Sequence, residues 1–266
     1  MKRRDFLKAG ALACAAGLVP LTACTPGEPA QTGAAPGAER AGQTGQARQW
    51  GLVIDVEKLA RLGIMDKIAA ACHRAHNVPQ IDDPATEVKW IWEEDFEHAF
   101  AEMDGGAHLP ERFRALGFPV LCNHCDEPPC VRVCPTQATF KRADGIVSMD
   151  YHRCIGCRFC MSACPYGARS LNFSDPRPYL EHVDPAYPTR SKGVVEKCLL
   201  CSERIEKGQA PLCAEASEGA ILFGDMDDPD SEVRRALAES FSIRRRVELG
   251  TGPNVYYLVK EGEGRA

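Results

Sequence analysis

The chain has 266 residues, of which 44% are hydrophobic and 26% are charged, and its formal net charge is −5 at pH 7. This apolar content is close to the globular average, so the chain can form one or two buried cores, while the mild negative charge gives no electrostatic reason to expect nucleic acid as a partner. Beyond the N-terminal segment, no stretch of the sequence is long and apolar enough to span a bilayer.

The N-terminal segment has the pattern of an export signal. Met1-Lys2-Arg3-Arg4 supplies a twin-arginine head, and a mostly apolar run follows from Ala9 to Ala23. This pattern predicts a twin-arginine signal peptide over residues 1–24, which places the folded protein on the periplasmic face of the cytoplasmic membrane. The end of the segment also fits a lipobox with Cys24 as the lipid attachment site; the alternative is ordinary cleavage nearby, with Cys24 discarded.

The remainder of the chain divides into a linker and a series of short strands. Residues 25–49 contain almost no large apolar side chain, so we expect a flexible tether. A buried strand is expected at residues 50–55. Strands at 138–141 and 146–149 are expected to form a hairpin turned by Asp144-Gly145, and further strands are expected at 168–173 and 219–223. These later strands each follow cysteines, so a repeated unit of loop, short helix and strand organises the chain.

The cysteines carry the strongest signal in the sequence. Two of the 14 cysteines, Cys14 and Cys24, lie in the signal segment, which leaves twelve. They form three runs, with one cysteine standing alone upstream: Cys72; Cys122, Cys125, Cys130 and Cys134; Cys154, Cys157, Cys160 and Cys164; Cys198, Cys201 and Cys213. The middle run has the bacterial ferredoxin spacing C-x2-C-x2-C-x3-C-P, in which three cysteines bind one 4Fe-4S cluster and the fourth binds a second. The spacing therefore predicts a protein that carries electrons.

Two other uses of cysteine remain open. Zinc sites also use C-x2-C pairs, but they combine two pairs across a longer loop and do not use a run of four that ends in Cys-Pro. A disulfide framework would suit an oxidising compartment, although small disulfide scaffolds rarely repeat such a run. Either alternative would make the chain a zinc or disulfide-stabilised structural lipoprotein, without redox function.

The residues around the cysteines place the chain in a family by resemblance. From Trp50 onward it resembles the four-motif ferredoxin-like subunits that serve dimethyl sulfoxide, polysulfide, tetrathionate and nitrite reductase systems. Within this family it is most similar to the DsrO group, the periplasmic iron-sulfur subunits of the DsrMKJOP membrane complex linked to dissimilatory sulfite reductase. The resemblance is carried by five stretches: residues 71–79, 87–92, 121–140, 149–166 and 195–198.

The resemblance implies a fold class. The family has an α+β fold of two tandem bacterial two-cluster ferredoxin-like modules, with an inner module inserted in an outer one. In this chain the inner module would span residues 119–174. The outer module would be formed by residues 50–118, which include an insertion, and by residues 175–266, which include a C-terminal extension.

The resemblance also implies which cysteines bind each cluster. Three 4Fe-4S clusters would use all twelve: one with Cys198, Cys201, Cys213 and Cys72, one with Cys122, Cys125, Cys130 and Cys164, and one with Cys154, Cys157, Cys160 and Cys134. Relatives with four clusters have four further cysteines, which bind a single cluster and which this chain lacks. Ser217 stands where one of them would be, and a serine ligand in place of Cys72 is the alternative.

The site of the missing cluster is expected to be filled by apolar side chains. Leu59, Leu62, Met65, Ile68 and Cys72 fall at near-helical spacing and would present one apolar face there.

Three other groups of residues have simpler interpretations. His124, between two cysteines, either donates to a cluster sulfur or is a solvated loop histidine. Arg244-Arg245-Arg246 fits a solvated face or a dock for an anionic partner. Trp90, Trp92, Phe96 and Phe100 are expected in the core, with a partner contact as the alternative.

The family resemblance implies a relay function. We expect an electron-transfer subunit without a substrate-converting site, in a membrane-associated respiratory complex of sulfur metabolism. The implied partners are a polytopic quinone-interacting membrane subunit, a multihaem cytochrome c, and other membrane and cytoplasmic subunits. The alternative within the same chemistry is the electron-transfer subunit of a molybdopterin oxidoreductase of the polysulfide, tetrathionate or dimethyl sulfoxide reductase type.

Overall fold

The computed structural model describes residues 49–103 and 109–259. The signal peptide over 1–24 with Cys24, and the tether over 25–49 except for its last residue, lie outside the described residues. Among those described, no helix is long and apolar enough to cross a membrane.

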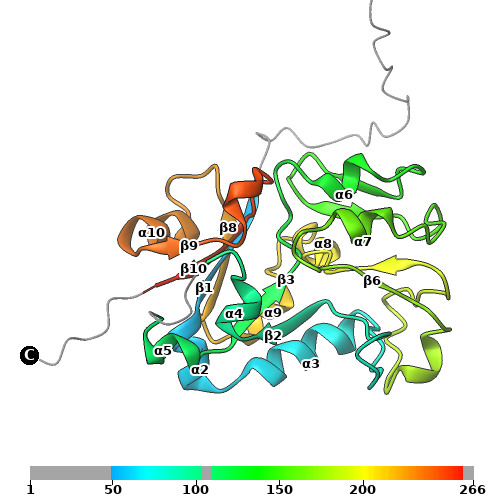
Figure 1. The fold of residues 1–266 in the computed structure, drawn as a ribbon, viewed down its shortest axis with the longest axis horizontal. Coiled ribbons are helices and arrows are strands. Elements are labelled where there is room, and N and C mark those ends of the chain that lie inside the picture. The colour runs from blue at the N-terminus through cyan, green and yellow to red at the C-terminus, as the bar shows by residue number, and fades with distance from the viewer. Residues whose placement is uncertain (1–48, 104–108, 260–266) are drawn as a thin grey trace, which may run out of the picture. The chain divides into compact units, whose positions relative to one another are not determined.

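A four-stranded sheet forms one end of the described unit (Figure 1). Its strands lie in the order β8 (Ile221–Asp225), β1 (Trp50–Asp55), β10 (Val255–Leu258) and β9 (Ser242–Ile243). The predicted strand at 50–55 is confirmed, and all but its first residue are buried because β1 pairs antiparallel with β8 and parallel with β10. Helix α10 (Glu232–Glu239) packs on this sheet through the buried Val233.

Two helices follow β1 directly. Asp55 caps α2 (Val56–Leu62) by accepting from the Lys58 N–H, and the helix ends at Gly63, whose φ of 61° favours glycine. Helix α3 (Met65–Ala75) is a separate helix. The expectation of one continuous apolar face was therefore wrong in part: Leu59, Ile68 and Cys72 are buried, but Leu62 lies at the end of α2 and is 36% exposed.

The insertion between Cys72 and Cys122 is an aromatic core. It contains β2 (Ile91–Glu94), α4 (Phe96–Ala99), α5 (Glu111–Arg114) and β3 (Phe118–Leu121), with β2 and β3 antiparallel. Trp90, Phe96 and Phe100 are buried, as expected, and Trp92 is partly buried against the core. The hydroxyl of Tyr257 in β10 donates to the Pro119 carbonyl over 2.8 Å, which ties this core to the sheet.

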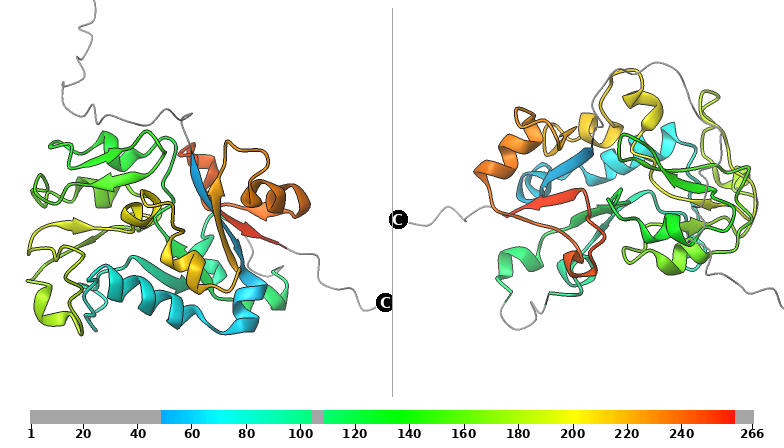
Figure 2. Two further views of the ribbon diagram at one scale, coloured as in Figure 1. Left: turned by 180° about the vertical axis from the view of Figure 1, so that it is seen from behind. Right: turned by 90° about the horizontal axis from the view of Figure 1, so that it is seen from above.

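Of the cysteine-bearing segments after β3, those of residues 122–164 (green) lie away from the sheet (Figure 2). The predicted hairpin is confirmed, with β4 (Thr139–Lys141) antiparallel to β5 (Val147–Met149). Only two residues of the strand predicted at 168–173 are extended, as β6 (Ser170–Leu171), which pairs with β7 (Val195–Glu196). The helices of these segments are short: α6 (Pro129–Arg132), α7 (Phe159–Ala163), η1 (Arg177–Tyr179), α8 (Ser202–Ile205) and α9 (Leu212–Ala216), and η2 (Val247–Leu249) follows α10.

The arginine run 244–246 is not a solvated face. Arg245 is 5% exposed and its Nε donates to the Ala99 carbonyl over 2.6 Å. The backbone N–H of Arg246 donates to the carboxylate of Glu102 over 2.7 Å. The side chain of Arg246 is partly exposed and pairs with Glu102, so Arg245 does not contribute to the basic docking patch that the sequence suggested and the charge of Arg246 is partly compensated.

Candidate metal centres

Three cavities are each lined by four cysteines. The outer cavity is lined by Cys72, Cys198, Cys201 and Cys213; the middle cavity by Cys122, Cys125, Cys130 and Cys164; the end cavity by Cys134, Cys154, Cys157 and Cys160. The three cavities are similar in size. All twelve cysteines of the described residues are free thiols, so none of them forms a disulfide. The groups of four coincide with those that the family resemblance implies.

Backbone conformation turns the cysteine loops around the cavities. Residues between or beside the cysteines take positive φ, which aims successive side chains to one side: His124 at 41°, Arg158 at 64° and Leu200 at 56°. Gly156 has a φ of 68°, and an added Cβ would lie 2.3 Å from the Gly193 carbonyl oxygen, so this position needs glycine.

Backbone N–H groups point at several of the sulfurs. The N–H of Leu200 donates to Cys198 Sγ over 3.3 Å, and that of Leu212 to Cys201 Sγ over 3.4 Å. Such donors stabilise a charged thiolate more than a neutral thiol.

The C-terminal segment braces the middle cavity. The N–H groups of Asp126 and Glu127 donate to the carbonyls of Gly252 and Thr251 over 2.9 and 3.0 Å. The side chain of Asn254 donates to the His124 carbonyl over 3.0 Å. The loop that carries Cys122 and Cys125 is thus held by residues more than a hundred positions later, which no local pattern in the sequence indicates.

The cavities differ in how far their cysteines are exposed. The four cysteines of the outer cavity are all buried, whereas in the end cavity Cys157 is exposed and only Cys160 is fully buried. Ile155 and Phe159, on either side of Cys157, are 67% and 59% exposed. The end cavity is therefore the one nearest the surface.

The middle cavity lies between the other two. Leu121 lines the outer cavity and the next residue, Cys122, lines the middle one. On the far side, Arg169 lines the middle cavity and contacts Thr139 and Met149, which line the end cavity. The order along the molecule is outer, middle, end.

Burial makes most of the outer thiols weak acids. Burial, with the nearby charge of Cys122 and Cys213, raises the pKa of Cys198 to about 12, and burial raises that of Cys213 to about 11. Burial also raises the pKa of Cys72 well above its ordinary value. Such thiols are held as thiolates only when a bound cation compensates their charge, which is the role of a metal centre.

Basic groups lower the pKa of one cysteine in the middle cavity. Burial alone would raise the pKa of Cys122, but His124, Lys197 and Arg169 together bring it well below the ordinary value. His124 is 2% exposed, so its interpretation as a solvated loop residue was wrong. Its Nδ1 accepts the Val147 N–H over 3.1 Å, which leaves the proton on Nε2.

Buried polar atoms without hydrogen-bond partners also lie at the middle cavity. The Nε2 of His124 and both side-chain polar atoms of Asn123, which lines the middle cavity, are buried and have no hydrogen-bond partner among the described residues. Two buried cations, Lys197 and Arg169, also lie beside the cavities without an ion pair to a carboxylate of the described chain. Buried hydrogen-bond donors and cations need acceptors or negative charge nearby, and an anionic metal–thiolate group would supply both.

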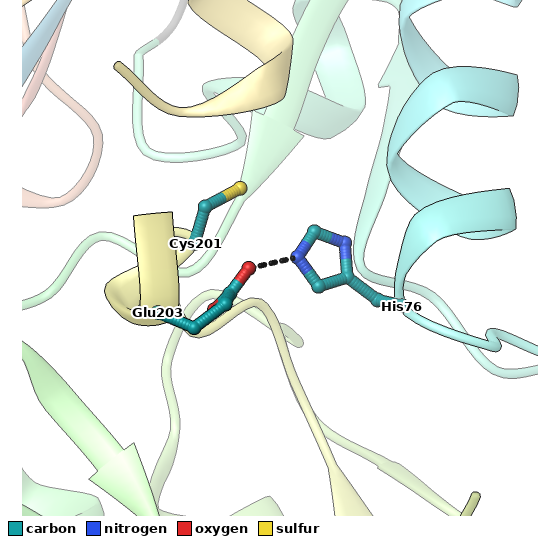
Figure 3. A group of neighbouring side chains, drawn as sticks. All are labelled: His76, Cys201 and Glu203. Carbon is teal, nitrogen blue, oxygen red and sulfur yellow. Dashed lines mark hydrogen bonds and ion pairs between the residues drawn. The ribbon is translucent and has the colours of Figure 1, made fainter. Parts of the chain in front are cut away.

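A histidine borders the outer cavity (Figure 3). The Nδ1 of His76 lies 2.7 Å from the Cys72 carbonyl oxygen and 3.6 Å from its sulfur, and Nε2 lies 3.1 Å from a carboxylate oxygen of Glu203. The ring is 1% exposed and stacks on Trp90. His76, Cys201 and Glu203 offer ligand atoms within 4.8 Å of one another, but the Cys201 sulfur also belongs to the outer cavity. The histidine thus lines that cavity and the glutamate holds its ring from behind, and sequence reasoning had given neither residue a role.

Ser217 lies away from the cysteine-lined cavities. Its hydroxyl donates to the Ala214 carbonyl over 2.7 Å and accepts the Ile221 N–H over 2.9 Å. The residues that line the outer cavity include Cys72 and do not include Ser217. The serine holds the turn between α9 and β8.

Comparisons with known proteins show that the chain contains a 4Fe-4S domain and an export signal. The family model for a 4Fe-4S dicluster domain matches residues 113–176, and the model for a twin-arginine translocation signal sequence matches residues 1–20. The export signal predicted from the sequence is confirmed and indicates export to the periplasm. The dicluster domain has mixed helix and strand content and covers all eight cysteines that line the middle and end cavities.

Relatives match most of the chain. It is 41% identical over 239 residues to the Hdr-like menaquinol oxidoreductase iron-sulfur subunit 1 of Archaeoglobus fulgidus, covering 82% of this chain and 86% of the relative. It is 36% identical to the iron-sulfur cluster-binding subunit of menaquinone reductase from Nitratidesulfovibrio vulgaris, covering 79% and 88%. It is 46% identical to an iron-sulfur subunit from Halobacterium salinarum that is named for dimethyl sulfoxide reductase, covering 79% and 78%.

Proposed function

Because the chain belongs to the family of iron-sulfur electron-transfer subunits of respiratory oxidoreductase complexes, we propose that it relays single electrons through three 4Fe-4S clusters, one in each cysteine-lined cavity. The observation that carries this proposal is the division of twelve free cysteines into three groups of four, each around one cavity. Four thiolates are the ligand set of one cubane cluster.

Each cluster would be held by a loop of three cysteines and one cysteine from elsewhere. The outer cluster would take Cys72 as its distant ligand, the middle cluster Cys164, and the end cluster Cys134. When bound, the clusters supply one-electron redox chemistry. The chain's own residues fix the positions of the clusters, exclude water from the outer and middle ones, and donate N–H groups to the sulfurs.

This arrangement corresponds to two ferredoxin-like modules. The middle and end clusters would lie in the inner module, residues 119–174, and the outer cluster in a module formed by residues 50–118 and 175–266. The outer module would hold one cluster in place of two, since Leu59 and Ile68 are buried side chains and Ser217 is hydrogen-bonded to backbone where relatives have cysteines. We expect no substrate-converting site in this chain.

The ligand sets are tested by a pair of variants in the outer module. Cys72→Ala should remove one cluster, because it deletes one of the four sulfurs of the outer cavity. Ser217→Ala should leave the iron content unchanged, because its hydroxyl bonds only to backbone. If Ser217→Ala loses iron and Cys72→Ala does not, the serine is the ligand and the proposed outer set is incorrect.

A redox titration tests the relay itself. Anaerobic titration of the purified chain with dithionite should consume about three electrons per polypeptide, one for each cluster. Electron uptake that stays near zero in a protein with its full metal content would indicate a redox-inactive metal such as zinc, and the relay would be refuted.

The complex that the chain serves has two candidate identities. We favour a complex of the DsrMKJOP type in sulfur metabolism, with a polytopic quinone-interacting membrane subunit and a multihaem cytochrome c, and with other membrane and cytoplasmic subunits beyond them. The similarity to the Hdr-like menaquinol oxidoreductase and menaquinone reductase subunits supports it. A lipid on Cys24 would anchor the exported chain to the membrane.

The second candidate is a molybdopterin oxidoreductase. Similarity to subunits named for dimethyl sulfoxide, selenate and tetrathionate reductases supports it about equally. Affinity purification from the native membrane separates the two candidates. A c-type cytochrome and a disulfide-reductase-like subunit would support the first, and a molybdenum-containing subunit would support the second.

A further inference from the structure

Each junction between neighbouring cavities contains one buried cation. Lys197 lies between the outer and middle cavities, and Arg169 lies between the middle and end cavities. We propose that these two residues are electrostatic positioning residues, whose charges raise the reduction potentials of the clusters on both sides of their junction. The inference rests on the proposed function, since it assigns roles toward the clusters proposed there.

The position of Lys197 is fixed by contacts to both of its neighbours. Its side chain is 0% exposed, and its Nζ donates to the Cys198 carbonyl over 2.7 Å and to the Val147 carbonyl. Cys198 lines the outer cavity and Val147 lines the middle one. Its charge also acts on the sulfurs of Cys198 and Cys122, one in each cavity.

Arg169 spans the next junction in the same way. It is 4% exposed, and Nη2 donates to Cys130 Sγ in the middle cavity over 3.0 Å. Nη2 also donates to Thr139 Oγ1 over 2.8 Å, and Nη1 lies 3.3 Å from Met149 Sδ, both on the wall of the end cavity. The charge of Arg169 acts on Cys160 as well, so both cavities have a sulfur under its influence.

The absence of a carboxylate partner points to the clusters as the counter-charge. Neither cation forms an ion pair with an acidic side chain in the described ranges, although a buried cation needs an opposite charge nearby. Arg190 is buried as well, but it has an acidic partner, since it pairs with Glu196 over 2.5 Å. Arg169 instead donates to a cysteine sulfur, Cys130 Sγ, and the charge of Lys197 acts on the sulfurs of Cys122 and Cys198.

A fixed positive charge favours the reduced state of a cluster, because reduction adds one negative charge. In a buried site this attraction is weakly screened by water or salt. The middle cluster has a cation on each side, and the outer and end clusters have one each. Removal of a single cation should therefore lower the potentials of two adjacent clusters and spare the third.

The test is a redox titration of the full-length chain followed by electron paramagnetic resonance. Lys197→Met should shift the outer and middle potentials to more negative values and leave the end potential unchanged. Arg169→Met should shift the middle and end potentials and leave the outer one unchanged. Signals are assigned by their loss in Cys72→Ala for the outer cluster and in Cys134→Ala for the end cluster.

Matched controls make the same chemical change at the surface. Lys67 and Arg177 have side chains 61% and 58% exposed and are paired with acidic side chains. Lys67→Met and Arg177→Met should leave all potentials at the wild-type values. The charge-keeping variants Lys197→Arg and Arg169→Lys should stay closer to wild type than the methionine variants.

The inference is overturned if the methionine variants keep all their clusters and their potentials match those of the surface controls, or if all clusters shift equally. If Lys197→Met fails to assemble clusters but Lys197→Arg succeeds, the positive charge is required and the inference is supported. If both variants fail, the shape of the lysine side chain and not its charge is required, and the inference is overturned for that junction. Absence of iron from the wild-type chain would instead refute the proposed function, which keeps the two failures distinct.

Discussion

The buried ion pair between Arg190 and Glu196 is expected to hold the outer cavity together. Both side chains are fully buried, and the guanidinium lies 2.5 Å from the carboxylate. Arg190 also donates to the carbonyls of His76 and Asn77, over 2.5 and 2.7 Å, just after the helix that carries Cys72. Glu196 lies two residues before Cys198. The pair therefore connects the two segments that meet at the outer cavity.

The variant Arg190→Met removes the cation and leaves the carboxylate buried. Glu196 would keep two donors, Trp90 Nε1 at 3.1 Å and Asn172 Nδ2 at 2.6 Å, but its charge would be uncompensated. Breaking one side of a buried pair costs about 3–5 kcal/mol. If the closed form of the outer cavity loses this stabilisation and the open form does not, the equilibrium constant for opening rises about a hundredfold to a few thousandfold.

The assay is the release of iron to an excess of chelator under anaerobic conditions. Arg190→Met should release about a third of its iron in a fast phase, because one cluster of three is affected. The matched control is Arg177→Met, which breaks an exposed pair with Asp175 and should cost only about 0–1 kcal/mol. Uniform release of all the iron, or a fast phase no larger than in the control, would refute the role of the pair at the outer cavity.

Two further predictions concern local geometry and pH. Gly156→Ala should destabilise the end cavity and lower its iron occupancy, because the new Cβ meets the Gly193 carbonyl. The control is Gly167→Ala, at a φ of 63° with open space around it. It should lower the free energy of unfolding by only about 1–2 kcal/mol and keep its iron. The hydrogen bond from His98 to Asp95 raises the pKa of the exposed His98 above 6.5, so its contribution to stability is full below pH 6.5 and is lost as the pH rises through the folded pKa. An NMR titration should show that raised pKa and its return to normal in Asp95→Asn; an unchanged pKa in that variant would contradict the assignment.

The sequence predicted the parts of the fold that depend on local spacing. The turn at Asp144-Gly145 specified the hairpin, and the β-branched and apolar run at 50–55 specified the central strand. The grouping of cysteines came from the family resemblance and coincides with the three cavities. Glycine at position 63 has a φ of 61° and divides the two helices that the apolar spacing had joined.

The residues that sequence reasoning missed are those whose roles depend on distant contacts. Lys197 adjoins a cysteine and Arg169 comes just before a short strand, but only the packed structure shows that both are buried without a carboxylate partner in the described part of the chain. Arg245 belongs to a run of charges, which normally faces solvent. It is buried because it donates to the Ala99 carbonyl and its guanidinium lies over the Tyr166 ring, and both of these partners are distant in the sequence. Burial of polar groups is a tertiary property, and no periodicity in the sequence encodes it.

Three cubane clusters in the three cavities are the central feature proposed for this protein. Iron and acid-labile sulfide, counted per polypeptide after anaerobic purification, test it most directly. We expect about 12 of each. About 8 of each would leave the outer cavity without a cluster and would contradict the ligand set with Cys72, and zinc with little iron would contradict the relay altogether.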